Sequence, residues 1–207
     1  MNIKLLTIAA LTATLSMSCG SSNHEEPKSE TVETAEAQTY AVNTEKSSVA
    51  WKGEVAGVYG HEGVVNVKTG GVAVTDGKIS GGEITIDMST IAATDSASYS
   101  DEEGHQITNL EGHLTTGDFF SIEEFPTATF VITAVDDSKI TGDLTVKGKT
   151  NSEEFIIVSS DVSDNNVSLN GTLKFDRQKY DVAWVHYMKD MILSDDISLN
   201  ISVTATK

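Results

Sequence analysis

Three acidic side chains near the middle of the chain are of the type needed for general acid–base chemistry. Asp118 lies shortly before Glu123 and Glu124, and two neighbouring carboxylates can divide the acid and base roles of a glycosidase. Such pairs also arise by chance, because the chain contains 31 acidic residues. The sequence has neither a Gly-x-Ser-x-Gly nucleophile motif nor a glycine loop of the kind that binds phosphate. It therefore does not predict an enzyme.

A second group combines histidine with glutamate, two residue types that bind transition metals. His105 and His113 lie close in sequence to Glu102, Glu103 and Glu111. Zinc sites have characteristic ligand spacings, often with cysteine, and this group matches none of them. We therefore expect no metal and no catalytic cofactor.

Three further polar residues have side chains that could bind the headgroup of a ligand. Arg177 is the only arginine in the chain, and a guanidinium can bind a phosphate through two parallel hydrogen bonds. Its alternative role is an ion pair with an acidic neighbour. Tyr180 either hydrogen-bonds a headgroup or anchors the end of a strand. His113 either lines a binding site or fixes one element to another, and the residues alone leave these alternatives open.

The charge of the chain excludes two classes of partner. The formal net charge is −17. Nucleic-acid binding requires Lys and Arg to neutralise phosphates, and docking on an anionic lipid surface depends on the same residues. We therefore expect neither contact from the body of the protein.

The elements that must position these side chains are β-strands, because apolar and polar residues alternate over much of the chain. A period of two is typical of strands with one buried face. The predicted apolar faces are Ile84, Ile86 and Met88; Ala128, Phe130, Ile132 and Ala134; Ile140, Leu144 and Val146; Val167, Leu169, Gly171, Leu173 and Phe175; and Ile197, Leu199, Ile201, Val203 and Ala205.

Strands with one apolar face each predict an all-β fold, an eight-stranded antiparallel barrel. Long open edges promote aggregation, so we expect the sheet to close on itself. A short helical insertion, roughly residues 94–116, would cap one end. An eight-stranded barrel is either filled by side chains or has room for one ligand. Large aromatic residues favour filling, whereas four small inward residues would leave volume: Ala128, Ala134, Gly142 and Gly171.

One stretch interrupts the alternation with a compact set of apolar residues. It runs from Leu110 to Phe130 as LEGHLTTGDFFSIEEFPTATF. Together with Gly81–Ile91, Gly142–Thr150 and Phe175–Tyr180, it resembles the sequence signature of the YceI-like family, and the resemblance extends over residues 40–207. It implies a lipocalin-like barrel, secreted or lipid-anchored, that binds isoprenoid and related lipids.

The resemblance favours a hollow barrel with one apolar ligand, namely an isoprenoid, an isoprenoid quinone or a fatty acyl chain, held for shielding or transport. The expected ligand contacts are Trp51, Ile86, Phe120, Phe130, Ile132, Leu144, Val146, Leu169, Leu173, Tyr180 and Trp184. His113 and Arg177 are the headgroup candidates. The alternative is a structural or adhesive surface lipoprotein with a filled barrel. A homodimer is compatible with the family, but no feature of this sequence specifies one.

The first residues have the features of a secretory leader. Lys4 precedes an apolar run, Leu5–Leu15, which is followed by small residues and the sole cysteine, Cys19. A membrane-spanning helix needs ~20 apolar residues, so this run is too short to span. The predicted parts are a signal peptide, residues 1–18; a lipidated cysteine with a flexible tether, 19–39; and the barrel domain, 40–207. We therefore expect a lipid-anchored protein of a Gram-negative cell envelope, either facing the periplasm or at the cell surface.

Overall fold

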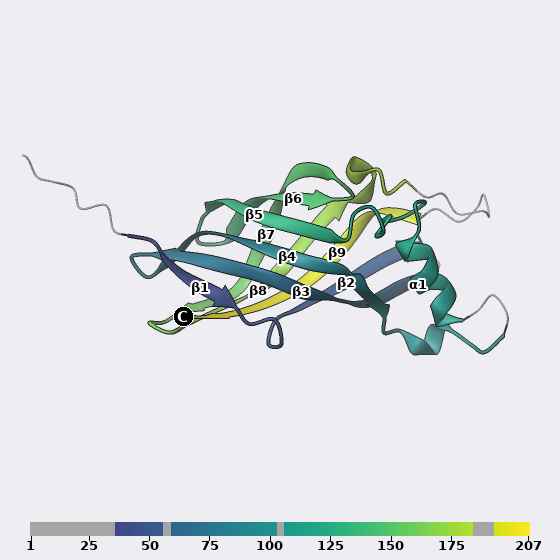
Figure 1. Cartoon of the computed structure of the whole chain (residues 1–207), viewed down its shortest axis with the longest axis horizontal. Coiled ribbons are helices and arrows are strands. Elements are labelled where there is room, and N and C mark those ends of the chain that lie inside the picture. Colours follow the sequence, from purple (N-terminus) through teal and green to yellow (C-terminus); the bar gives the residue numbers. More distant parts are fainter. Residues whose placement is uncertain (1–35, 56–58, 103–105, 184–192) are drawn as a thin grey trace, which may run out of the picture. The chain divides into compact units, whose positions relative to one another are not determined.

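The computed structural model describes residues 36–55, 59–102, 106–183 and 193–207 (Figure 1). The predictions for Cys19, the signal peptide, most of the tether and Trp184 fall outside these residues. The elements, in chain order, are β1 (Gln38–Val42), β2 (Ser48–Val55), β3 (Tyr59–Thr75), β4 (Lys78–Ala93), the 3₁₀ helix η1 (Ser96–Ser98), α1 (Ile107–Thr115), β5 (Thr127–Val135), β6 (Lys139–Val146), β7 (Lys149–Val162), β8 (Asn166–Asp176), the 3₁₀ helix η2 (Arg177–Tyr180) and β9 (Leu193–Thr206).

The strands form a closed antiparallel barrel, which confirms the predicted fold class. Their order is β1-β3-β2-β9-β8-β7-β6-β5-β4, and pairing of β4 with β3 closes the circle. The segments β1 and β2 both lie between β3 and β9. Residues 59–65 of β3 pair with β2, and residues 71–74 pair with β1. Nine strand segments therefore fill eight positions around the barrel.

Alternation of apolar and polar residues determines which side chains face the interior, as predicted for most strands. Along β8, every second residue from Val167 to Phe175 is buried. The prediction was wrong for Ala134, which is exposed. The pairing of β5 with β6 shifts register between Ile132 and Ala134, so that Val135 instead packs against the core. A bulge of this kind places an extra residue in one strand and reverses the faces beyond it.

Two inward glycines make room for aromatic rings. A Cβ added at Gly142 would lie 2.4 Å from Cζ of Phe130, and one added at Gly171 would lie 2.4 Å from Cζ of Phe155. The expectation that these glycines leave volume for a ligand was therefore wrong, because the neighbouring phenyl groups occupy that space.

The predicted insertion contains the single α-helix among the described residues. It comprises η1 and the nine-residue helix α1, which contacts the end of β4 and lies at one end of the barrel (Figure 1). The backbone N–H of Ala93 donates a 3.0 Å hydrogen bond to Oε1 of Glu111, which ties α1 to β4. Leu114 is buried, so the apolar face of the helix covers the barrel interior.

The other end of the barrel is filled by side chains. Tyr40 of β1 is buried, and its hydroxyl donates a 3.0 Å hydrogen bond to the carbonyl oxygen of Ser163, which directly follows β7. Val72, Val167 and Ala205 are also buried in this region, where β1 joins β3 and β9. Interior space therefore lies toward the end that carries α1.

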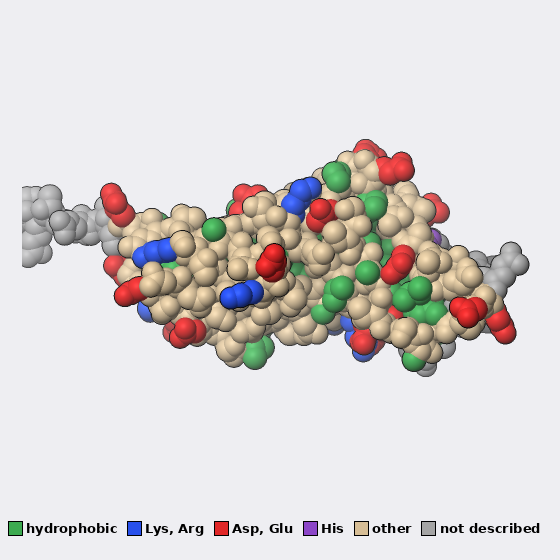
Figure 2. Space-filling view, turned by 60° about the horizontal axis from the view of Figure 1, so that its bottom comes forward, with side chains coloured by type: hydrophobic (Ala, Val, Ile, Leu, Met, Phe, Trp, Pro, Cys, Tyr) green, Lys and Arg blue, Asp and Glu red, His purple; other side chains and the backbone are tan. Residues whose placement is uncertain are grey.

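The outer face carries much of the charge of the chain. Figure 2 shows acidic side chains spread over one face of the barrel, with fewer basic ones among them. In the part of the chain that the structure describes, no helix is long and apolar enough to cross a bilayer.

Candidate ligand-binding cavity

The interior of the barrel contains an apolar cavity of about 210 Å³ on the side of α1. Each of seven strands, β2 to β6, β8 and β9, contributes side chains to its wall, which puts the cavity inside the barrel. Leu110, His113 and Leu114 of α1 and Phe119 and Phe120 of the following turn also line it. An apolar cavity of ~150 Å³ can hold a molecule the size of benzene. The cavity is therefore large enough for part of an apolar chain.

A smaller apolar cavity of about 70 Å³ lies deeper in the barrel. Five residues line both cavities and separate them: Val49, Ile86, Ala128, Leu144 and Leu199. We call these five residues the constriction. A ligand chain longer than the first cavity would reach the second by displacing some of their side chains.

The structure places most of the predicted ligand contacts in these two walls. The first cavity is lined by Trp51, Ile86, Phe120, Leu144 and Val146, and also by the headgroup candidate His113. The second is lined by Phe130, Ile132, Leu169 and Leu173, in addition to Ile86 and Leu144. Tyr180 and Arg177 line neither cavity, and Trp184 lies outside the described residues.

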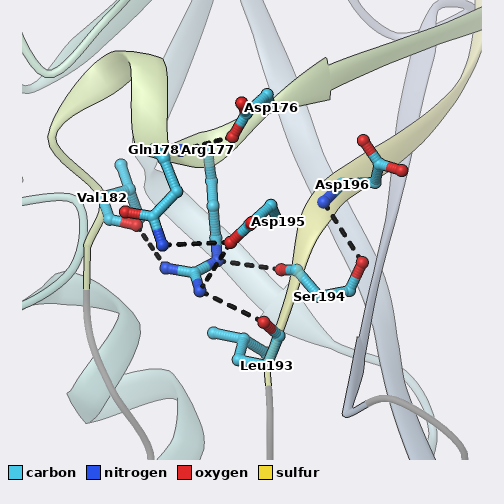
Figure 3. A network of polar contacts seen from close by, with 8 residues as sticks. All are labelled: Asp176, Arg177, Gln178, Val182, Leu193, Ser194, Asp195 and Asp196. Atoms are coloured by element: carbon cyan, nitrogen blue, oxygen red, sulfur yellow. Dashed lines mark hydrogen bonds and ion pairs between the residues drawn. The ribbon is translucent and has the colours of Figure 1, made fainter.

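Arg177 occupies a network of backbone contacts (Figure 3). Its Nε donates to the carbonyl oxygen of Ser194 at 2.9 Å and its Nη1 to that of Val182 at 2.6 Å. Nη2 donates to the carbonyl oxygen of Leu193 and to Oδ1 of Asp195, both at 3.3 Å. The Arg177 side chain is 3% exposed. These contacts favour the structural alternative, in which Arg177, at the start of η2, joins the segment after η2 to the start of β9.

Tyr180 is also held by protein groups. Its side chain is fully buried, and its hydroxyl donates a 3.0 Å hydrogen bond to Oε1 of Glu153 on β7. Its ring packs edge-on against Phe175, with ring centroids 5.3 Å apart. Burial, reinforced by the Glu153 carboxylate, raises the pKa of Tyr180. The strand-end anchor, rather than a headgroup contact, accounts for these interactions.

His113 faces the first cavity from the last turn of α1. Its ring packs edge-on against Phe119, with centroids 5.5 Å apart. Burial lowers the pKa of His113, and nearby Asp118 offsets this only in part. The imidazole is therefore neutral at pH 7, which suits an apolar wall.

A polar cluster that was not predicted from the sequence adjoins the same cavity. His61 of β3 lines the wall, and its Nδ1 lies 2.9 Å from Oδ2 of Asp95 and 2.7 Å from the hydroxyl of Tyr99. Burial works to raise the pKa of Asp95, but hydrogen bonds, led by that from His61, hold this pKa below its ordinary value. The sequence contains one indication that His61 faces the interior, because His61 shares its strand face with Val65 and Val67. Asp95 and Tyr99 follow in an irregular segment without such a period.

Comparison with known proteins identifies a related family. The sequence pattern of the YceI-like domain matches residues 40–205. A UPF0312 protein of Staphylococcus aureus strain USA300 is 40% identical over 80 residues, which is 35% of this chain and 46% of the relative. A second, from strain MSSA476, is 49% identical over 55 residues, or 27% of this chain and 32% of that protein. The matched segments thus span less than half of these relatives.

Two solved structures share the fold. The crystal structure of Burkholderia cenocepacia BcnA has a TM-score of 0.57 at 21% identity, covering 80% of this chain and 99% of that one. A polyisoprenoid-binding domain from Saccharophagus degradans, implicated in plant cell wall breakdown, has a TM-score of 0.54 at 9% identity. That alignment covers 81% of this chain and 97% of the other. At these identities, the likeness supports the barrel architecture alone.

Proposed function

The chain belongs to the YceI-like domain family, and on this premise we propose that its barrel holds one long apolar ligand, either an isoprenoid, an isoprenoid quinone or a fatty acyl chain. The observation that carries the proposal is the apolar cavity of about 210 Å³ beneath α1. A barrel filled by side chains, as the structural or adhesive alternative requires, would not retain it. The polyisoprenoid-binding domain of Saccharophagus degradans, which has the same architecture, lends support to this ligand class.

The physical role that fits such a cavity is shielding or transport. Moving one CH₂ group out of water gains ~0.8 kcal/mol, so an apolar chain strongly avoids water. Such a chain starts in a bilayer, however, and its transfer from there to an apolar cavity is close to neutral. The barrel therefore accepts and releases a chain without having to compete strongly with the membrane.

The proposed location of the protein follows from its N-terminus. We propose that Cys19 carries lipid and holds the barrel at a membrane of a Gram-negative cell envelope, with the residues up to 39 as a tether. Replacing Cys19→Ala should release the protein from the membrane fraction and remove the lipid mass from its N-terminal peptide. The neighbouring Ser18→Ala variant serves as the control and should remain anchored. An unlipidated N-terminus in the wild type would contradict the proposal.

The ligand is tested by extracting the purified full chain with organic solvent and analysing the extract by mass spectrometry. We expect a co-purifying lipid with a long apolar chain. Leu173→Trp should fill the deeper cavity and lower the lipid yield, because Leu173 lines that wall. The adjacent Thr172 is exposed, so Thr172→Trp is the matched control and should leave the yield unchanged. An extract without lipid above background would favour the filled-barrel alternative.

A further inference from the structure

His61 lines the apolar cavity, and one of its ring nitrogens has no hydrogen-bond partner among the described residues. Both of its polar contacts, to Asp95 and Tyr99, are made by Nδ1. Among the residues that the structure describes, Nε2 makes no hydrogen bond. Neither Asp95 nor Tyr99 lines the cavity, whereas His61 does. Nδ1 therefore bonds to protein groups, and Nε2 is available to form a hydrogen bond with a ligand.

The partners of Nδ1 determine the chemistry of Nε2. The ionised Asp95 accepts a hydrogen bond at 2.9 Å, so Nδ1 carries the hydrogen. The single hydrogen on Nδ1 is then shared between Asp95 and the hydroxyl of Tyr99, 2.7 Å away, and Tyr99 donates its own hydrogen to Oδ1 of Asp95 at 3.5 Å. In a neutral imidazole with hydrogen on Nδ1, Nε2 is an acceptor. The ring therefore matches a ligand that donates a hydrogen bond.

Charges around the cavity do not match an anionic headgroup. The described residues that line it include no lysine and no arginine. The carboxylates of Asp95 and Glu111 lie near this end, since Asp95 binds His61 and Glu111 binds the end of β4. Lys147 is occupied, because its Nζ donates to the carbonyl oxygens of Gly117 and Asp181. Phosphate groups are bound by clustered cations, and the described part of this wall has none.

We infer that Nε2 of His61 accepts a hydrogen bond from the hydroxyl of an uncharged ligand whose apolar chain occupies the cavity. The ligand class is thus an alcohol or phenol with a long apolar tail, rather than a phosphate or diphosphate ester of the same tail. This inference rests on the proposed function, because it requires the cavity to bind the tail. It assigns His61 as the residue that selects the headgroup.

The test compares three probes with one tail: geraniol, geranyl methyl ether and geranyl diphosphate. Binding to the delipidated full chain is followed through tryptophan fluorescence, since Trp51 lines the cavity. Geraniol should bind about fivefold or more tightly than the ether, because one hydrogen bond is lost, and more tightly than the diphosphate. In His61→Phe this preference for the alcohol over the ether should disappear while binding of the ether persists. Glu62→Gln, on the outward face of the same strand, should behave as wild type.

Equal binding of the alcohol and ether by wild type, tighter binding of the diphosphate, or an alcohol preference that survives in His61→Phe would each overturn the inference. If these results occur while Leu144→Trp abolishes tail binding, the proposed function stands and only the headgroup assignment fails. If no probe binds, both fail. Should His61→Phe not fold, the three wild-type affinities still decide, because equal or inverted affinities contradict the inference without the variant.

Discussion

The hydroxyl of Tyr180 donates a 3.0 Å hydrogen bond to Oε1 of Glu153, and both side chains are buried. This pair joins η2 to β7 and accounts for a tyrosine that the sequence suggested as a ligand contact. Removing the hydroxyl would leave the Glu153 carboxylate without its closest donor. The carboxylate's remaining ion-pair partner, Lys179, lies 3.9 Å away.

Tyr180→Phe should therefore destabilise the fold without changing the ligand. A buried acceptor that loses its partner costs about 1–3 kcal/mol, and urea denaturation should show a loss of free energy of unfolding in this range. Tyr59→Phe is the control, because Tyr59 is 41% exposed. An unchanged midpoint in Tyr180→Phe, or a changed lipid yield at unchanged stability, would contradict the structural role.

Arg177→Lys should be more damaging than its conservative chemistry suggests. The guanidinium donates to three backbone carbonyl oxygens from both sides of residues 184–192, and an ammonium cannot reproduce this planar arrangement. We expect a loss of about 2–4 kcal/mol in the free energy of unfolding.

The control for Arg177 is Lys174→Ala. Lys174 pairs with Asp196 on the surface, where both side chains are at least half exposed, and such a pair is worth ~0–1 kcal/mol. Equal losses in the two variants, measured in the same denaturant series, would refute the role assigned to Arg177.

Gly142→Ala should destabilise the barrel by overpacking. The new methyl group would meet the ring of Phe130 at 2.4 Å and the carbonyl oxygen of Val131 at 2.7 Å. Overpacked cores lose about 1–3 kcal/mol, and a thermal melt would show the decrease. Gly112→Ala on α1, where a methyl group meets no atom within 4 Å, should instead be neutral or stabilising. Similar melting temperatures for the two variants would mean that Phe130 moves aside without cost.

His113 should make stability depend on pH. Burial lowers the pKa of the folded histidine below the ordinary value of 6.5. The unfolded chain therefore takes up a proton first as the pH falls. The contribution of neutral His113 to the free energy of unfolding is complete above pH 6.5. It is lost as the pH falls through the pKa of the folded histidine.

Between pH 8 and pH 5.5 the melting temperature of wild type should thus fall more than that of His113→Leu, which has no titrating group at this position. Other groups, mainly carboxylates, titrate in both proteins, so the difference between the two curves isolates His113. Parallel curves would exclude a buried neutral histidine on α1.

The sequence predicted the barrel because a period of two depends only on local alternation. It could not place the bulge after Ile132, since the extra residue becomes visible only in the pairing of β5 with β6. Nor could it show that Phe130 fills the space above Gly142, which depends on a neighbouring strand. For the same reason the sequence could not decide the role of Arg177, whose partners lie up to 18 residues away along the chain.

For the site, alternation correctly predicted which residues of regular strands face the interior, but the polar cluster around His61 was not predicted. Leu144 and Leu169 were found from their alternation and do line the cavities. His61 and Asp95 are separated by 34 residues, and the antiparallel pairing of β3 with β4, in which Gly63 lies opposite Ala93, brings them together. A contact of this kind has no local signature.

In the proposed function, one apolar chain occupies the space around the constriction. Native mass spectrometry of the purified full chain measures this directly as the mass bound per barrel. We predict one bound lipid per wild-type barrel, loss of this mass in Leu144→Trp, and its retention in Thr145→Trp, whose side chain points outward from the same strand. A wild-type barrel without bound mass, or equal occupancy in Leu144→Trp and Thr145→Trp, would contradict the claim.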